Sequence, residues 1–174
     1  MNLILRSGIA YVKLLIAAIC IFVISGSGAA FADNAPTITV FKKPSCGCCG
    51  KWVDHLKDNG FKVDVKQARS MAAIKKSIGL QPKLHSCHTA FLNRDGSAKQ
   101  PSGDHHKSTP YIIEGHVPAK EIKRLLAEKP DIKGLTVPGM PAGSPGMEME
   151  DGTKDKYDVL SFDEAGKTEI YSSY

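Results

Sequence analysis

After residue 24 the sequence lacks a second long apolar run, and it also lacks an internal repeat and a strong excess of charge of one sign. Without a second apolar run, only the N-terminal segment is a candidate for insertion into a bilayer. The formal net charge of +5 comes from lysines scattered along the chain, a balance too mild to indicate a nucleic-acid-binding protein. The informative features that remain are the N-terminus and the cysteines.

The N-terminal segment has the features of an export signal. It carries Arg6 and Lys13 and no acidic residue, and an apolar run follows at 14–24. Small residues lead to Ala30-Phe31-Ala32, an A-x-A site. A cationic start, a short apolar core and such a site are typical of a secretory signal peptide, so we predict a signal peptide over 1–32, cleaved after Ala32.

Export determines the chemical environment of the mature chain. The alternative to cleavage is an uncleaved membrane anchor that begins as early as Ile9. With cleavage, residues 33–174 form a single domain with a net charge of +3 and no membrane segment, and Cys20 is lost. The form of the signal indicates a bacterial periplasm, an oxidising compartment in which unprotected thiols tend to become disulfides.

Four cysteines remain in the mature chain. Cys46, Cys48 and Cys49 lie within four residues, and Cys87 stands in Ser86-Cys87-His88. Two directly adjacent cysteines bridge only with strain, and pairing two of the three leaves the third unpaired. The cluster therefore indicates either a soft metal ion or thiol chemistry.

The order of the predicted elements indicates an α/β fold of the thioredoxin-like type. β-Branched and alternating patterns predict strands at 37–41, 62–65, 89–92 and 111–113. Helices are predicted from the cysteines with Cys49, Trp52, Val53 and Leu56 inward, from Ser70 with Met71, Ile74 and Ile78 inward, and from Pro118 with Ala119, Ile122, Leu125 and Leu126 inward. The cysteines thus fall at a helix N-terminus, where the helix dipole favours thiolates.

Three further segments complete the expected architecture. Residues 93–110 are polar and turn-rich, which predicts an inserted, solvent-facing hairpin connection. From residue 134 to 149 the chain is rich in Gly, Pro and Met. The alternating runs 157–162 and 167–171 predict a C-terminal β-hairpin.

The available donors favour copper. Besides the four cysteines, the chain offers imidazoles at His88 and His116 and thioethers at Met140 and Met147. Thioethers are poor ligands for Zn²⁺ and good ones for Cu(I). Crowded cysteines can bridge neighbouring ions, so we predict a multinuclear Cu(I)–thiolate site.

The other histidines are weaker candidates. His55 lies on the order of 10 Å along the helix from the cysteines and is expected to face solvent. His85 is expected to have an ordinary structural role. His105-His106 lies in the polar connection, where surface exposure is the expected role.

Two other functions stay open on the residues alone. Cys46 and Cys49 form a C-x-x-C pair, so a thiol-disulfide oxidoreductase is the main alternative, although Cys48 would compete as a third thiol. A structural Zn²⁺ site or a disulfide scaffold is the third, since four cysteines allow three pairings. Enzymatic turnover is left undecided.

Four motifs in order resemble the CopG-like copper-resistance family of exported bacterial proteins. They are the runs at 43–52, 86–90, 114–119 and 137–148, and the resemblance extends from about Thr37 to about Tyr171. It implies a thioredoxin-like fold, a cysteine-bridged multinuclear copper site, and a periplasmic role in copper tolerance, with Cu(I)/Cu(II) interconversion. By position, the implied ligands are Cys46, Cys48, Cys49, Cys87, His88 and His116.

The resemblance also sets the expected partners. They are copper ions and other periplasmic copper-handling proteins, with no nucleic acid. The stretch 93–110 departs from the short turn that is usual in the family. This departure leaves the ligand positions intact and affects the surface that other proteins would recognise.

Overall fold

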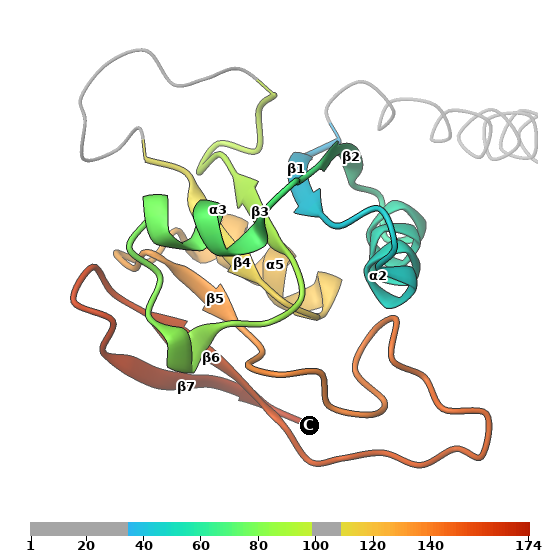
Figure 1. The fold of residues 1–174 in the computed structure, drawn as a ribbon. Coiled ribbons are helices and arrows are strands. Elements are labelled where there is room, and N and C mark those ends of the chain that lie inside the picture. The colour runs from blue at the N-terminus through green and yellow to red at the C-terminus, as the bar shows by residue number, and fades with distance from the viewer. Residues whose placement is uncertain (1–34, 99–108) are drawn as a thin grey trace, which may run out of the picture. The chain divides into compact units, whose positions relative to one another are not determined.

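The computed structural model describes residues 35–98 and 109–174 (Figure 1). Within these ranges the chain forms one seven-stranded sheet of order β2-β1-β3-β4-β5-β6-β7. The strands are β1 (Thr37–Lys42), β2 (Lys62–Gln67), β3 (Thr89–Leu92), β4 (Tyr111–Glu114), β5 (Gly134–Thr136), β6 (Asp158–Phe162) and β7 (Thr168–Ser173). The helices are α2 (Gly47–Asp58), α3 (Met71–Ser77) and α5 (Ala119–Glu128), with a 3₁₀ turn at Pro82–Leu84. The predicted α/β class is confirmed.

The sheet register brings three separate chain segments together at one end of the inner strands β1, β3 and β4. β3 lies antiparallel to β1, with Phe41 opposite Thr89, and β4 lies antiparallel to β3, with Thr89 opposite Glu114. The end of β1, the beginning of β3 and the end of β4 are therefore side by side. The cysteine loop follows β1, Cys87 and His88 precede β3, and His116 follows β4. All predicted Cys and His ligands therefore meet at this end of the sheet.

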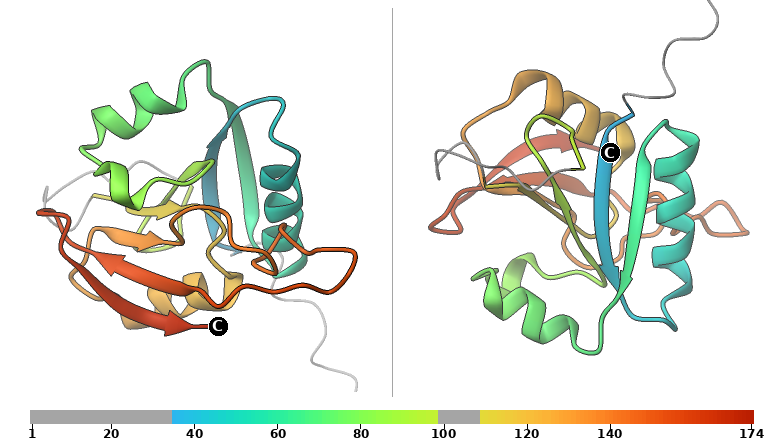
Figure 2. Two further views of the ribbon diagram at one scale, coloured as in Figure 1. Left: turned by 60° about the horizontal axis from the view of Figure 1, so that its bottom comes forward. Right: turned by 90° about the horizontal axis from the view of Figure 1, so that it is seen from above.

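Helices cover both faces of the sheet. α2 and α5 share one face and α3 lies on the other (Figure 2). Trp52 and Leu56 of α2 and Ile122 of α5 pack in the larger core cluster with Ile113 of β4. The preceding residue of the strand, Ile112, belongs to the second cluster on the α3 side. Successive side chains of a strand point to opposite faces, so β4 is buried on both sides.

The predicted helix starts agree with the structure. Ser70 caps α3, because its hydroxyl accepts a hydrogen bond from the Ala73 amide at 3.2 Å. One inward side chain of α3 was not anticipated. Lys75 is buried, with 4% of its surface exposed, whereas Ile74, which was expected to face inward, is only partly buried.

The C-terminal part of the sheet was predicted only in part. β6 and β7 pair antiparallel where the terminal hairpin is expected. β5, parallel to β4, was not anticipated, because a run of three residues that begins with glycine carries too little pattern to be recognised. Gly134 is required there, since a Cβ atom would overlap the backbone of Ile112.

Some predictions lie outside the described residues. These are the signal peptide at 1–32 and most of the inserted connection, residues 99–108, which includes His105-His106. Among the residues described, no helix is long and apolar enough to span a membrane.

Candidate metal centre

Three cysteines lie at the beginning of α2. Cys46 occupies the N-cap position with extended backbone, and its amide donates to the Lys43 carbonyl at 3.1 Å. Cys48 and Cys49 follow in the first turn of the helix, which contains no acidic residue. Unpaired backbone N–H groups and the positive end of the helix dipole therefore face these sulfurs. The predicted position at a helix N-terminus is confirmed.

The four cysteine sulfurs form one group. Cys46 and Cys49 are joined by a disulfide, and Cys48 and Cys87 are free thiols. The Cys48 sulfur lies 3.6 Å from that of Cys46, and the Cys87 sulfur lies 3.3 Å from that of Cys49. All four lie within 4.8 Å of one another. When the disulfide is reduced, this spacing suits a soft ion that several thiolates bind or share.

Two imidazoles extend the group through Cys87. The Cys87 sulfur lies 3.3 Å from Nδ1 of His88 and 3.1 Å from Nε2 of His116. These three ligand atoms also lie within 4.8 Å of one another. Cys87 thus belongs both to an all-sulfur group and to a Cys-His-His group.

His116 is held in the tautomer that a metal ligand requires. Its Nδ1 lies 2.7 Å from the Pro145 carbonyl, so Nδ1 carries the proton and donates it. Nε2 is left with its lone pair toward Cys87. Burial lowers the pKa of His116, which keeps the imidazole neutral. A hydrogen bond from the second ring nitrogen is the usual support of a metal-bound histidine.

His88 is fully buried between two rings. Its ring centroid lies 4.2 Å from that of Trp52 and 5.1 Å from that of His116. Burial, with a smaller contribution from the nearby charge of Lys75, lowers the pKa of His88 well below its usual value. Nε2 has no hydrogen-bond partner among the described residues. A neutral imidazole in this position can donate a lone pair to a metal ion.

Cys87 is poorly suited to exist as a bare thiolate. Burial, together with the neighbouring Cys48, raises the pKa of its thiol to about 12. A bound cation would remove this penalty, because its charge compensates that of the thiolate. The electrostatics of the group therefore fit a cation that is bound together with thiolate formation.

The loop at 137–147 packs against the cysteine helix. Gly146, at φ +87°, lies so close to α2 that a Cβ atom would be 2.7 Å from the backbone nitrogen of Trp52 and 2.8 Å from the Cys48 carbonyl oxygen. Figure 2 shows this orange segment beside α2. The same loop supplies the Pro145 carbonyl to His116. Sequence reasoning missed this role, because a backbone carbonyl leaves no signature in a sequence.

The two predicted methionine ligands are placed differently. Met147 is partly buried and directly follows Gly146, whereas Met140 is 52% exposed. Ligation by either thioether stays a prediction.

The bystander histidines have structural partners. His85 Nε2 lies 3.0 Å from the Leu80 carbonyl, in line with an ordinary structural role. His55 was expected to face solvent, and this is wrong: it is half-buried, and its Nε2 accepts a hydrogen bond from the Ala119 amide at 3.0 Å. The side chain thus caps α5. Helical periodicity did not reveal this cap because it joins two elements far apart in sequence.

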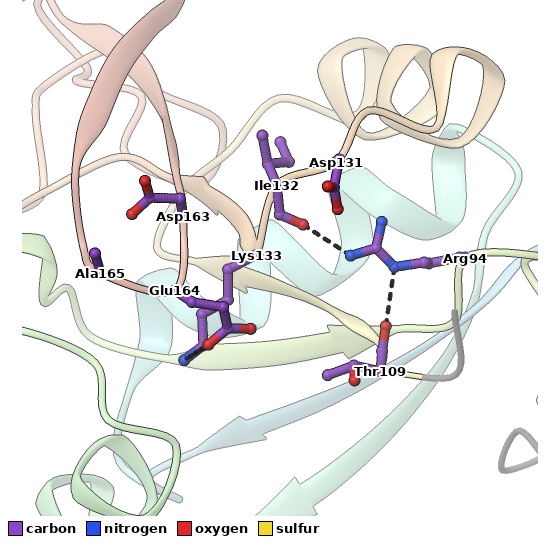
Figure 3. A pocket seen from close by; sticks show the side chains of 8 residues that line it. All are labelled: Arg94, Thr109, Asp131, Ile132, Lys133, Asp163, Glu164 and Ala165. Carbon is purple, nitrogen blue, oxygen red and sulfur yellow. Dashed lines mark hydrogen bonds and ion pairs between the residues drawn. The ribbon is translucent and has the colours of Figure 1, made fainter. Parts of the chain in front are cut away.

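A separate pocket of about 620 Å³ does not resemble a metal centre (Figure 3). The Arg94 guanidinium donates to the Thr109, Pro130 and Ile132 carbonyls and lies 4.1 Å from the centre of the Tyr111 ring. The Lys133 ammonium lies 2.7 Å from the Glu164 carboxylate. Arg94 and Lys133 therefore both have structural partners within the protein.

Comparison with solved structures gives two matches with the same name. "Copper resistance protein copG- Form 1" is 36% identical, with a TM-score of 0.67, and the match covers 80% of this chain and 98% of that chain. "Copper resistance protein copG- Form 2" is also 36% identical, with a TM-score of 0.66, and covers 79% and 97%. A family described as "Protein of unknown function, DUF411" matches residues 105–147. No curated protein matches the chain.

Proposed function

The chain belongs to the CopG-like copper-resistance family, and from this premise we propose that it holds Cu(I) in a cysteine-bridged, multinuclear site. The observation that carries the proposal is the shared position of Cys87. Its sulfur belongs to the four-sulfur group and to the group with His88 and His116. One ion in each group would have Cys87 as a common ligand.

The donor set supports Cu(I) over harder ions. Four thiolates and two neutral imidazoles are soft or borderline ligands, and thiolate-rich sites select Cu(I). Zn²⁺ also accepts thiolate and imidazole, but a single tetrahedral ion would use only four of these six donors. Met140 and Met147 are proposed as additional soft donors.

The proposed cellular role follows from the predicted signal peptide. We place the mature protein, residues 33–174, in the periplasm as a single domain that sequesters copper and confers copper tolerance. Cu(I)/Cu(II) interconversion at the site and exchange with other periplasmic copper-handling proteins belong to the same proposal. A thioredoxin-like core is supported by the order β2-β1-β3-β4, with β1 parallel to β2 and antiparallel to β3.

A second candidate function is thiol-disulfide exchange. The Cys46–Cys49 disulfide at the start of α2 favours it. Cys46 is the more accessible partner, since Cys49 has no exposed surface. Two further thiols within 3.6 Å of the disulfide sulfurs compete in any exchange reaction, which makes this the weaker candidate.

Anaerobic titration of the fully reduced mature protein with Cu(I) tests the proposal. We expect more than one Cu(I) per chain, with cuprous–thiolate luminescence and sulfur and nitrogen ligands in the copper absorption-edge spectrum. One equivalent of Zn²⁺ with no copper uptake would contradict it.

Cys48→Ser separates the two candidate functions. The variant keeps Cys46 and Cys49, so it should lose the copper cluster and retain any disulfide exchange, measured by mixed-disulfide trapping. Unchanged copper stoichiometry in this variant would refute the role of Cys48 in the cluster.

A further inference from the structure

A buried ion pair lies directly beneath the ligand segments. Lys75 of α3 and Glu114 of β4 are ion-paired, with 4% and 0% of their surfaces exposed. Thr89 of β3, also fully buried, donates to Glu114 Oε2 at 2.7 Å and accepts from Lys75 Nζ at 2.9 Å. The network joins a helix to two strands of the sheet.

The Glu114 carboxylate also contacts the segment that carries two predicted ligands. Its Oε1 accepts a hydrogen bond from the Ser86 amide at 2.6 Å, and Ser86 precedes Cys87 and His88. Glu114 itself lies two residues before His116. One carboxylate therefore connects the Ser86–His88 segment to the strand that leads to His116.

The backbone between these segments is equally close. The Gly115 amide donates to the His88 carbonyl at 3.2 Å. Gly115 has φ +72°, and a Cβ atom there would lie 2.5 Å from both Ser86 Oγ and the Val137 carbonyl oxygen. A small displacement of the Ser86–His88 segment would thus change its position relative to His116.

Stability alone does not account for a charged pair at this place. The other residues of β4 are Tyr111, Ile112 and Ile113, and well-packed apolar residues are often as stable as a buried ion pair or more so. What an apolar side chain cannot supply is an acceptor for the Ser86 amide. The pair thus provides a directional contact to a ligand segment.

We propose that Glu114, held in place by Lys75 and Thr89, is a positioning residue that fixes the Ser86–His88 segment so that Cys87 and His88 meet His116. This inference rests on the proposed Cu(I) site. Glu114 acts through the Ser86 amide and touches no metal ion itself.

Two double variants separate positioning from stability. Lys75→Met with Glu114→Gln removes both charges and keeps an amide oxygen that can accept from the Ser86 amide. Lys75→Met with Glu114→Leu removes both charges and also the acceptor. Neither variant leaves an unpaired buried charge, and unfolding with denaturant and near-ultraviolet circular dichroism verify that both fold.

The first readout needs no copper. Amide hydrogen exchange in the reduced, metal-free protein should show protection of the Ser86 amide in the wild type and in the Glu114→Gln double variant. In the Glu114→Leu double variant this protection should be lost, while the β1 and β3 amides stay protected. Equal protection of Ser86 in both double variants would overturn the inference.

The second readout is Cu(I) affinity, measured by competition with a chromophoric cuprous chelator. Loss of an outer contact to a ligand typically weakens metal binding 10- to 100-fold, and we expect this for the Glu114→Leu double variant. The Glu114→Gln double variant should stay within about threefold of the wild type, and the absorption-edge spectrum should show fewer nitrogen ligands only in the Leu form.

The outcomes distinguish this inference from the proposed function. If the wild type binds no Cu(I), the proposed function fails, while amide exchange still tests the positioning. If the wild type binds Cu(I) and the Glu114→Leu double variant matches it, only the positioning role fails. If the Glu114→Leu double variant does not fold, Thr89→Val takes its place in the same two measurements, because it removes one hydrogen bond to Glu114. Wild-type values in both measurements would then overturn the inference.

Discussion

The two sides of the candidate metal centre are built in different ways. The helix side consists of Cys46, Cys48 and Cys49, which the first turn of α2 brings together within four residues. The buried side consists of Cys87, His88 and His116, which come from two loops separated by 28 residues. The helix side needs only a local helix start. The buried side needs the sheet register and several distant contacts.

This difference shows where the centre is vulnerable. The buried side depends on residues that are not ligands themselves. They are Glu114 beneath Ser86, Pro145 at His116, and Trp52, whose Nε1 donates to the Val117 carbonyl at 2.9 Å. Changes at such residues should disturb the buried side and leave the helix side intact.

The largest effect is expected from Lys75→Met alone. It leaves the Glu114 carboxylate buried without its cation, and breaking a buried pair in this way costs about 3–5 kcal/mol of unfolding free energy. Denaturant unfolding of the metal-free protein measures it. The matched control is Lys57→Met in the exposed Lys57–Asp54 pair, at 3.3 Å, where we expect a change below about 1 kcal/mol. Equal effects would contradict the assigned importance of the buried pair.

Gly146→Ala should have the next largest effect. The alanine is strained at φ +87°, and its Cβ overlaps α2 at Cys48 and Trp52. We therefore expect the unfolding free energy to fall by about 2–4 kcal/mol and the loop that holds His116 to be displaced. Gly152→Ala is the control, because Gly152 has φ +76° and open space around its Cβ position, and about 1 kcal/mol is expected.

Ligand counting in the two glycine variants sharpens the comparison between the two sides. The Gly146→Ala protein should lose nitrogen ligands from the copper absorption-edge spectrum and keep its sulfur ligands. A full set of nitrogen ligands in this variant would show that the loop does not position His116.

The smallest effect concerns His55 and pH. Burial lowers the pKa of His55, partly opposed by Glu148 and Asp58 and assisted by Lys123. Near and below pH 6.5, the ordinary pKa, His55 is therefore protonated more in the unfolded chain than in the folded one. Its contribution to the unfolding free energy is fully present above pH 6.5 and is lost as the pH falls below that value. Because protonation removes the acceptor of the Ala119 amide, the wild type should lose more unfolding free energy than His55→Gln between pH 7.5 and 5.5, by at most the roughly 1 kcal/mol that a helix cap contributes.

Denaturant unfolding of the metal-free proteins at the two pH values measures this difference. His88 and His116 also have lowered pKa values, but both proteins share them, so their contribution cancels in the comparison. An identical pH dependence in wild type and variant would show that protonation of His55 does not disturb the start of α5.

Much of the secondary structure followed from local patterns. The stripe Cys49, Trp52, Val53 and Leu56 is buried along α2 as predicted, and Ser70 and Pro118 stand at the starts of α3 and α5. β5 was not predicted, because its burial comes from its neighbours in the sheet. Lys75 escaped because its burial depends on Glu114, a partner 39 residues away.

The chemistry of the centre was readable in the same way, within limits. The clustered cysteines, His88 next to Cys87, and His116 just before the helix predicted from Pro118 were the six Cys and His candidates, and the structure brings all six together. The roles of Met140 and Met147 were not decided, since a thioether in a Gly- and Pro-rich loop has no periodic pattern that fixes its direction.

The sequence alone determined which donors are present and that three of them gather at a helix start, because a helical turn is a local structure. Only the tertiary structure decided that Cys87, His88 and His116 converge, which tautomer His116 adopts, and that a buried carboxylate lies beneath them. These features depend on strand register and on hydrogen bonds between residues 28 or more positions apart, and such contacts exist only once the chain has folded.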